Sequence, residues 1–207
     1  MDALARQCVN GFRPVRQAAI GHLQKVLLAP QLLSGEHIQL RLIFEEIIFP
    51  ALENLLKPQV FQRDPSPGGM QETRMRMCSM LCKIFLHYLL DLNESAKELN
   101  DLWLKILNFY DRFLNCGKKD QLAESLPETV KNILLVMHAS QILVPPPPKG
   151  AEEPRSPAQI EMWTLTAERL SKFLPSMLDE VLSRADVGQA PAPPLQDAPD
   201  GAQGPSA

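Results

Sequence analysis

The stretch RPVRQAAIGHLQKVLL (Arg13–Leu28) decides the fold class, because its apolar residues recur at intervals of three and four. That spacing places them on one face of an α-helix. A helix of this length is marginal in water on its own, so the face needs a neighbouring helix. Pro14 suits the first turn, and Pro30 marks the end. The predicted buried face consists of Val15, Ala18, Ala19, Leu23, Val26 and Leu27, and the residues predicted on other faces are Arg16, Gln17 and Gln24.

The composition is that of an ordinary folded protein of the cytosol. The chain has 207 residues, of which 45% are hydrophobic and 22% charged, and its net charge of −3 gives no basic field for nucleic acid. No apolar run approaches the roughly 20 residues of a membrane span. The start MDALARQC lacks the apolar core of a secretory signal. The cysteines follow no disulfide framework and are expected as reduced thiols; they are Cys8, Cys78, Cys82 and Cys116.

Three further segments carry strong helical patterns. Leu40–Leu55 has an apolar stripe that Pro50 interrupts, which predicts a kink or two shorter helices. Glu72–Leu90 is apolar around much of its circumference, which predicts a central helix. The next helix begins at Ser95, and Glu98 three residues later predicts a capping box.

The second half of the chain carries more helix boundaries. Gly117 is expected as a left-handed cap. Gln121–Leu126 predicts one short helical turn, and Ser125–Glu128 (SLPE) predicts the start of a new helix. Ser156–Gln159 (SPAQ) combines a cap serine, a proline at the first helical position and a glutamine at the third, so it predicts a further capping box.

These segments predict an all-α fold in which antiparallel helix pairs stack as a HEAT- or armadillo-like α-solenoid. A helical repeat region spans residues 1–143 with a flexible loop at 57–70, a proline-rich linker follows at 144–155, and a helical segment at 156–184 packs on the repeats. The expected apolar face of that last segment is Ile160, Trp163, Ala167, Leu170, Leu174, Met177 and Leu178. Residues 185–207 have almost nothing to bury and are expected to be disordered.

A weak internal repeat accompanies this pattern. LQKVLL (Leu23–Leu28) aligns with LCKIFL (Leu81–Leu86) at a shift of 58 positions. That shift exceeds the roughly 40–47 residues of HEAT and armadillo repeats. The proline- and glycine-rich loop between the two segments accounts for the excess.

Six segments together resemble one known family. In order they are RPVRQAAIGHLQKVLL, FEEIIFPALENLL, TRMRMCSMLCKIFLHYL, LNDLWLKILNFYDRFL, ESLPETVKNILLVMHASQIL and MWTLTAERLSKFLPSMLDEVL. Their order and wording are similar to the C-terminal helical region of the large Golgi Arf guanine-nucleotide exchange factors, the brefeldin-A-resistance family. The similarity covers about Ala3–Leu182.

The resemblance implies a setting at the Golgi, where such exchange factors activate Arf GTPases that recruit vesicle coats. Their exchange domain uses a glutamate finger, and no counterpart is recognisable here, because Glu45 and Glu46 of FEEII stand in a different context. The chain is therefore expected to be a C-terminal fragment or short product without exchange activity of its own. Leu4, Cys8 and Val9 then suggest half of a repeat, with an apolar edge that packs on preceding repeats.

One basic set is the candidate binding site for anionic lipid or an acidic partner. Each charge near an anionic membrane contributes about 1 kcal/mol. The alternative is a solvated face with internal ion pairs. Arg16 and Arg76 stand near the starts of their helices, which favours a structural role for them. The set is Arg13, Arg16, Arg74, Arg76 and Lys83.

Other residue types with reactive chemistry favour structural explanations. Cys78 and Cys82 share a helical face and could supply two thiolate ligands, but structural zinc needs four, so two small buried side chains are favoured. Trp103 and Trp163 lie on apolar stripes and are expected in the core, with a partner hot spot as the alternative. The scattered histidines are expected as ordinary surface residues; they are His22, His37, His87 and His138.

Two functions remain open on the sequence alone. The first is a non-catalytic regulatory region of a Golgi Arf exchange factor, peripheral at Golgi membranes, that binds protein partners or the anionic membrane surface. The second is a free-standing α-solenoid adaptor that binds a peptide in its concave groove. An enzyme is disfavoured, and no cofactor is expected, because no nucleophile, metal or phosphate-loop motif is present. Ser66 and Ser156 precede prolines and are candidate phosphorylation sites.

Overall fold

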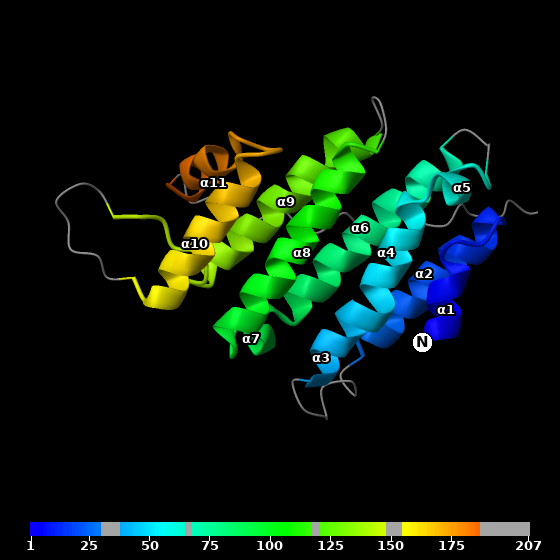
Figure 1. The fold of residues 1–207 in the computed structure, drawn as a ribbon, viewed down its shortest axis with the longest axis horizontal. Coiled ribbons are helices and arrows are strands. Elements are labelled where there is room, and N and C mark those ends of the chain that lie inside the picture. The colour runs from blue at the N-terminus through cyan, green and yellow to red at the C-terminus, as the bar shows by residue number, and fades with distance from the viewer. Residues whose placement is uncertain (30–37, 65–67, 117–120, 148–154, 187–207) are drawn as a thin grey trace, which may run out of the picture.

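The computed structural model describes residues 1–29, 38–64, 68–116, 121–147 and 155–186 (Figure 1). Within these ranges all regular structure is helical, and there is no strand. The prediction of an all-α protein is therefore confirmed. The predicted cap at Gly117, His37, Ser66, linker residues 148–154 and tail residues 187–207 lie outside the described residues.

The helices follow the chain in this order: α1 (Asp2–Gln7), α2 (Arg13–Leu27), α3 (Ile38–Leu42), the π-helix η2 (Ile43–Ile48), α4 (Phe49–Leu56), α5 (Pro58–Phe61), α6 (Gly69–His87), α7 (Leu89–Leu92), α8 (Ala96–Leu114), α9 (Gln121–Ala139), α10 (Pro157–Leu170) and α11 (Met177–Asp186). The expected loop at 57–70 thus contains the short helix α5.

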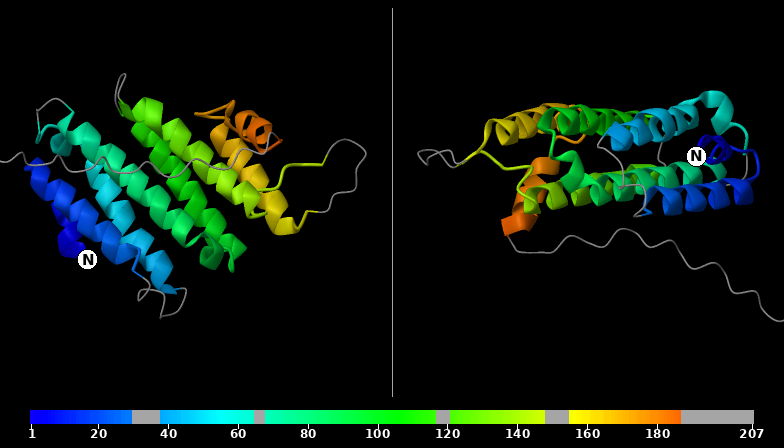
Figure 2. Two further views of the ribbon diagram at one scale, coloured as in Figure 1. Left: turned by 180° about the vertical axis from the view of Figure 1, so that it is seen from behind. Right: turned by 90° about the horizontal axis from the view of Figure 1, so that it is seen from below.

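The long helices lie in two layers (Figure 2, right). One layer holds α2, α6 and α9 side by side, and the other holds α4, α8 and α10. The chain passes from one layer to the other with each long helix, so sequential helices face each other across the core. At the two ends, α1 packs against α2 and η2, and α11 packs against α9 and α10.

Neighbouring helices within a layer run parallel, and their contacts join residues about 60 positions apart. Arg16 of α2 bonds Thr73 near the start of α6, and the hydroxyl of Tyr88, just after α6, donates to the carbonyl of Leu27. In the other layer, Lys105 and Arg112 of α8 pair with acidic side chains of η2 and α4 that lie 60 and 59 positions earlier. The aligned segments LQKVLL and LCKIFL accordingly lie in adjacent helices.

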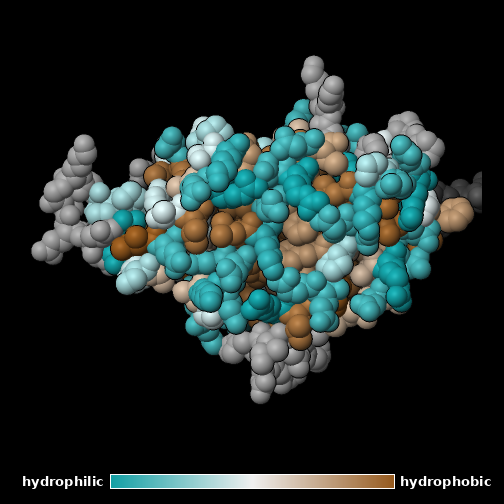
Figure 3. All heavy atoms as spheres, viewed as in Figure 1, coloured by the Kyte–Doolittle hydropathy of each residue, from teal (hydrophilic) through white to brown (hydrophobic). Residues whose placement is uncertain are grey.

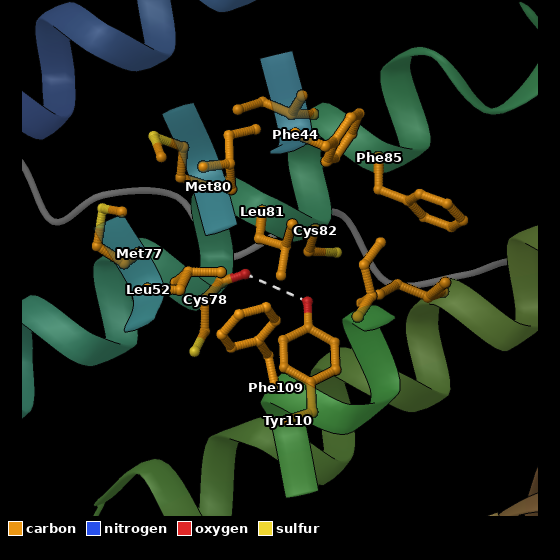
Figure 4. Packing of buried hydrophobic residues seen from close by; sticks show 14 of the residues in the cluster. Phe44, Leu52, Met77, Cys78, Met80, Leu81, Cys82, Phe85, Phe109 and Tyr110 are labelled. Atoms are coloured by element: carbon orange, nitrogen blue, oxygen red, sulfur yellow. Dashed lines mark hydrogen bonds between the residues drawn. The ribbon is translucent and has the colours of Figure 1, made fainter. Parts of the chain in front are cut away.

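The core between the layers is rich in aromatic and sulfur-containing side chains (Figure 4). The Phe85 and Trp103 rings stack with centroids 5.5 Å apart, and the Phe49 and Phe109 rings with centroids 5.1 Å apart. The Tyr110 hydroxyl donates to the backbone carbonyl of Cys78 at 3.4 Å, which connects α8 to α6. The Phe85–Trp103 stack and the Tyr110–Cys78 hydrogen bond join the two layers, whereas the Phe49–Phe109 stack joins α4 to α8 within one layer.

Pro50 produces the predicted interruption through a widened turn. Proline has no N–H to donate to the carbonyl of Glu46. The chain forms the π-helix η2 directly before it, and the N–H of Phe49 donates five residues back, to Phe44. One stripe of apolar residues stays buried through η2 and α4: Ile43, Phe44, Ile47, Ile48, Phe49, Ala51, Leu52 and Leu55.

The predicted buried face of α2 is confirmed at Ala19, Leu23 and Leu27 and wrong at Val15, Ala18 and Val26. Val15 and Val26 are each 39% exposed and Ala18 is exposed, whereas Arg16, predicted on another face, is fully buried. The apolar residues of α2 form a wide stripe, and the neighbouring helices in the described chain cover only part of it. The buried face that results is Arg16, Ala19, Ile20, Leu23 and Leu27.

The predicted break before Pro127 is also wrong, because α9 runs through this proline without interruption. A proline inside a helix costs about 3 kcal/mol or more. Leu122, Leu126 and Val130 are buried on both sides of it, so burial of one continuous apolar face outweighs that cost. The Thr129 hydroxyl also donates to the carbonyl of Ser125, at 3.0 Å.

The C-terminal segment forms two helices where one was expected. The helix α10 ends at Leu170, and α11 begins at Met177 after the Phe173-Leu174-Pro175 stretch. The inward face of α10 also differs from the prediction: Met162 and Thr166 are buried with Leu170, whereas Ile160 is 37% exposed. Helix α11 extends to Asp186, two residues into the expected tail.

The two predicted serine caps have different outcomes. Ser156 forms the complete capping box of α10: its hydroxyl accepts from the N–H of Gln159, and the Gln159 side chain accepts from the N–H of Ser156. Ser95 occupies the cap position of α8, but its side chain makes no capping hydrogen bond. The capping box predicted at Ser95 and Glu98 is therefore wrong.

This pair provides a matched test of the cap. We expect Ser156→Ala to lower the free energy of unfolding by about 1 kcal/mol, because the N–H of Gln159 loses its side-chain acceptor. The same change at Ser95 should stay within about 0.5 kcal/mol, since no bond is lost. Urea titrations followed by circular dichroism measure both. Equal losses at the two serines would contradict this account.

Candidate interaction surfaces

Arg16 lies inside the protein and is unavailable to a lipid surface in this fold. Its guanidinium group donates to Thr73 at 2.9 Å, to Asp64 at 2.5 Å, and to the carbonyls of Asn10, Gly11 and Gly69. Those partners come from before α2, from the α5–α6 connection and from α6. A buried charge is tolerated only when it is paired and hydrogen-bonded in this way. Arg16 therefore fixes the join between the first helices.

Arg74 is the second buried member of the predicted basic set. Its Nε and Nη2 atoms donate to the carbonyl of Leu55 at 3.1 and 2.9 Å, and Nη2 also lies 3.5 Å from the sulfur of Cys116. Leu55 belongs to the last turn of α4, whose terminal carbonyls lack helical donors. Arg74 of α6 thus caps the C-terminal end of α4, which lies in the opposite layer.

The remaining members of the set lie at the surface. Arg13 and Arg76 both pair with Glu72, which also accepts a hydrogen bond from Gln17. Lys83 lies two turns further along α6 and is half-buried. The structure therefore divides the five predicted residues into a buried pair with structural contacts, a surface pair around Glu72, and the separate half-buried Lys83.

The cysteine side chains of the central helix are buried, as expected for small apolar groups. Burial raises the pKa of the Cys82 thiol to about 12, against the smaller opposing effect of Lys83. Burial also raises the pKa of the Cys78 thiol, although the Arg74 guanidinium opposes it. Thiols with such values stay protonated and unreactive near neutral pH. In the described ranges, no group of three or more histidine, cysteine or acidic residues is placed to hold a metal ion.

The structure describes both tryptophans and three of the histidines that the sequence analysis considered. Trp103 is fully buried and its Nε1–H donates to the hydroxyl of Thr166 at 2.9 Å, so it is a core residue. Trp163 packs against the same core but is only partly buried. His22 and His87 are exposed. The Nδ1 atom of His138 lies 2.9 Å from the carbonyl oxygen of Leu143.

Ion pairs between neighbouring helices cross the outer face of α4, α8 and α10. Arg112 bonds both carboxylate oxygens of Glu53 at 2.6 Å, and this contact lowers the pKa of Glu53. Arg169 of α10 reaches Asp111 at 2.7 Å. Figure 3 shows this face, where hydrophilic side chains cover most of the surface and hydrophobic ones are visible between them. An exposed pair such as Arg112–Glu53 contributes little to stability on its own.

A surface pocket of about 240 Å³ was missed by sequence reasoning. It lies where α3, α7 and α8 meet, and its walls combine carboxylates with leucines. No motif marks these residues, because they come together only when the chain turns between α7 and α8. The lining residues are Leu40, Asp91, Leu92, Glu94, Ser95 and Glu98.

In the described ranges, no helix has both the length and the apolar character needed to span a membrane. The features described so far are helical layers, buried arginines and charged outer faces. They explain how the chain packs, but they do not by themselves identify a function. Comparison with known proteins decides the family.

A family profile described as "GBF1-like, tetratrico peptide repeat region" matches residues 1–177. The chain belongs to this family. The resemblance stated from the sequence is therefore confirmed. The description names tetratrico peptide repeats, which are helix–turn–helix units of 34 residues, whereas the sequence suggested a HEAT or armadillo type.

Named relatives agree with this assignment of the GBF1-like region. The chain is 31% identical over 182 residues to a Golgi-specific brefeldin A-resistance guanine nucleotide exchange factor 1 homolog of Caenorhabditis elegans, and 29% identical over 194 residues to the ARF guanine-nucleotide exchange factor GNOM of Arabidopsis thaliana. These matches cover 88% and 91% of the chain. The chain spans only 8% and 13% of those two proteins. No solved structure matches it.

Proposed function

We propose that the GBF1-like region is a non-catalytic regulatory and interaction part of a Golgi Arf guanine-nucleotide exchange factor. In this role it supports recruitment to Golgi membranes and regulation of Arf activation in vesicle transport. The observation that carries the proposal is the family match over residues 1–177, together with relatives whose names state exchange activity on Arf. The matched family is described as a repeat region, which supports placing nucleotide exchange elsewhere in such a protein.

The architecture favours a scaffold. Parallel neighbours in each layer, joined by contacts between residues about 60 positions apart, suit an α-solenoid in which each helix pair contacts only the adjacent pairs. Such proteins bind partners over extended surfaces and need no reactive centre. We therefore propose that the region acts at the cytoplasmic side of the Golgi as a peripheral, protein-binding solenoid.

Arg13, Arg76 and Lys83 are the proposed contact residues for an anionic lipid surface or acidic partner. They lie on α2 and α6, and Glu72 neutralises part of their charge. Arg16 and Arg74 are left out of this surface, because their guanidinium groups are buried against backbone carbonyls. A surface with this small net charge contributes about 1 kcal/mol per cation, so it assists recruitment and does not determine it.

Two measurements test the role. We expect the purified chain to leave the rate of nucleotide release from a fluorescent-nucleotide-loaded Arf GTPase unchanged, because it supplies no exchange domain. We expect deletion of the region from the exchange factor to reduce its Golgi association, followed by fluorescence microscopy, while exchange by the isolated catalytic domain stays intact. Accelerated release by the chain, or full Golgi association after the deletion, would overturn the proposal.

A further inference from the structure

The side of α2 that faces away from α6 carries an apolar row. Phe12, just before the helix, is 75% exposed, and Val15 and Val26 are each 39% exposed, with the exposed His22 between them. Their spacing places them along one side of the helix. In the described part of the chain, α2 is the outermost helix of its layer, and no helix of that layer lies beyond it (Figure 2, left). Other exposed apolar side chains are scattered over separate elements.

The internal repeat identifies the residues of α6 that are equivalent to this row, and these residues are buried. A shift of 58 positions maps Phe12, Val15, His22 and Val26 onto Met70, Thr73, Met80 and Ile84 of α6. All four α6 residues are at most 3% exposed. Thr73 belongs to the side of α6 that meets α2, because its hydroxyl accepts a hydrogen bond from Arg16. In α6, the whole row is therefore buried, and Thr73 within it is turned toward the preceding helix of its layer.

The same arrangement continues into α9. Shifting Thr73 and Met80 of this row by a further 57 positions gives Val130 and Met137, which are both fully buried. One buried cation accompanies each helix at the same interval: Arg16 in α2, Arg74 in α6 and Lys131 in α9. Three successive helices thus share one structural unit. Only in α2 does the row lack a covering helix among the described residues.

We propose that the row Phe12–Val15–His22–Val26 is the binding site for a further helix pair of the same repeat type, supplied by another part of the same exchange-factor polypeptide. The inference rests on the proposed function in one respect, namely that this region is part of a longer exchange factor. The occupant's helix lies parallel to α2 and presents aliphatic side chains, as the buried face of α2 does with Ile20, Leu23 and Leu27.

Two observations favour an occupant within the same polypeptide over a second copy. Neighbours in each layer here are parallel and are joined by about 60 residues of chain, which a continuing polypeptide reproduces. A two-fold dimer through α2 would instead place the row against itself, whereas Thr73 in the equivalent row of α6 meets Arg16 on a different face of α2. The matched relatives are also long enough to supply such a pair, because the chain spans 8% and 13% of them.

Thiol labelling of the native exchange factor tests the site. The protein is tagged at its own gene, purified without denaturation, and carries Cys116→Ser to remove the exposed natural thiol. Val26→Cys reports on the row, and Asp101→Cys on the exposed face of α8 is the matched control. We expect a maleimide to react at least about tenfold more slowly at position 26 than at position 101, because a covered thiol reacts only when the contact opens.

Cross-linking identifies the occupant. We expect a lysine-reactive cross-linker to join Lys25, next to the row, to residues of the same polypeptide outside this region, as read by mass spectrometry. Equal labelling at positions 26 and 101 would overturn the proposal. Cross-links between two differently tagged copies, or to another protein, would overturn it as well. None of these readouts depends on Arf activation or Golgi association, so failure of the site and failure of the proposed function are distinguishable.

Discussion

Arg16→Met is expected to destabilise the domain by about 3–5 kcal/mol, the cost of breaking a buried ion pair by removing one partner. The substitution removes the ion pair with the Asp64 carboxylate and removes donors from the carbonyls of Asn10, Gly11 and Gly69. Methionine fills much of the volume, so the loss reflects the hydrogen bonds and the ion pair that Arg16 makes. Guanidinium titration followed by circular dichroism gives the free energy of unfolding.

Arg13→Ala is the matched control for this prediction. Arg13 belongs to the same helix and also forms an ion pair, but its side chain is 44% exposed. Its removal should cost no more than about 1 kcal/mol, as for other surface pairs. Arg16→Lys should fall between the two, because it keeps the charge but has fewer donors. A loss at Arg16→Met no larger than at Arg13→Ala would show that the buried network adds no stability.

Trp103→Ala is expected to lower the free energy of unfolding by about 3–5 kcal/mol, the range for truncating a large buried aromatic side chain. Trp103 stacks on Phe85 of α6 and donates to Thr166 of α10, so the change opens a cavity where three helices meet. Thermal or chemical unfolding of the purified chain measures the effect.

Thr166→Val separates the hydrogen bond from the packing. Valine keeps the shape of threonine but leaves the buried indole N–H without an acceptor, at a cost of about 1–3 kcal/mol. Trp163→Ala is the aromatic control, and its effect should be smaller because that ring is only partly buried. If truncation at position 163 destabilises the chain as strongly as truncation at position 103, the greater contribution expected from the fully buried Trp103 is wrong.

The sequence predicted the helices well, because each depends on local spacing. The capping box at Ser156 uses groups within four residues, so it could be read directly. The same motif at Ser95 lacks its bond in the structure. A local pattern indicates where a helix starts, but it does not determine the side-chain geometry there.

The positions of the basic residues could not be predicted, because burial of a charge depends on distant partners. Arg16 reaches Asp64 and Gly69, which lie 48 and 53 positions away, and Arg74 reaches back to Leu55. No pattern within one helix identifies such acceptors. The predicted helix break before Pro127 is wrong for a related reason. Packing of α9 against α6 outweighs the strong local tendency of a proline to end a helix.

The widened turn before Pro50 has a consequence for the apolar spacing around it. The buried residues Leu40, Phe44, Ile48 and Leu52 recur strictly every fourth position, as do Ile43, Ile47, Ala51 and Leu55. On a regular α-helix a step of four overshoots a full turn by about 40°, so both rows would spiral away from the core. The larger number of residues per turn in η2 cancels part of that drift. A strict four-residue spacing of apolar residues beside a proline therefore indicates a locally underwound helix.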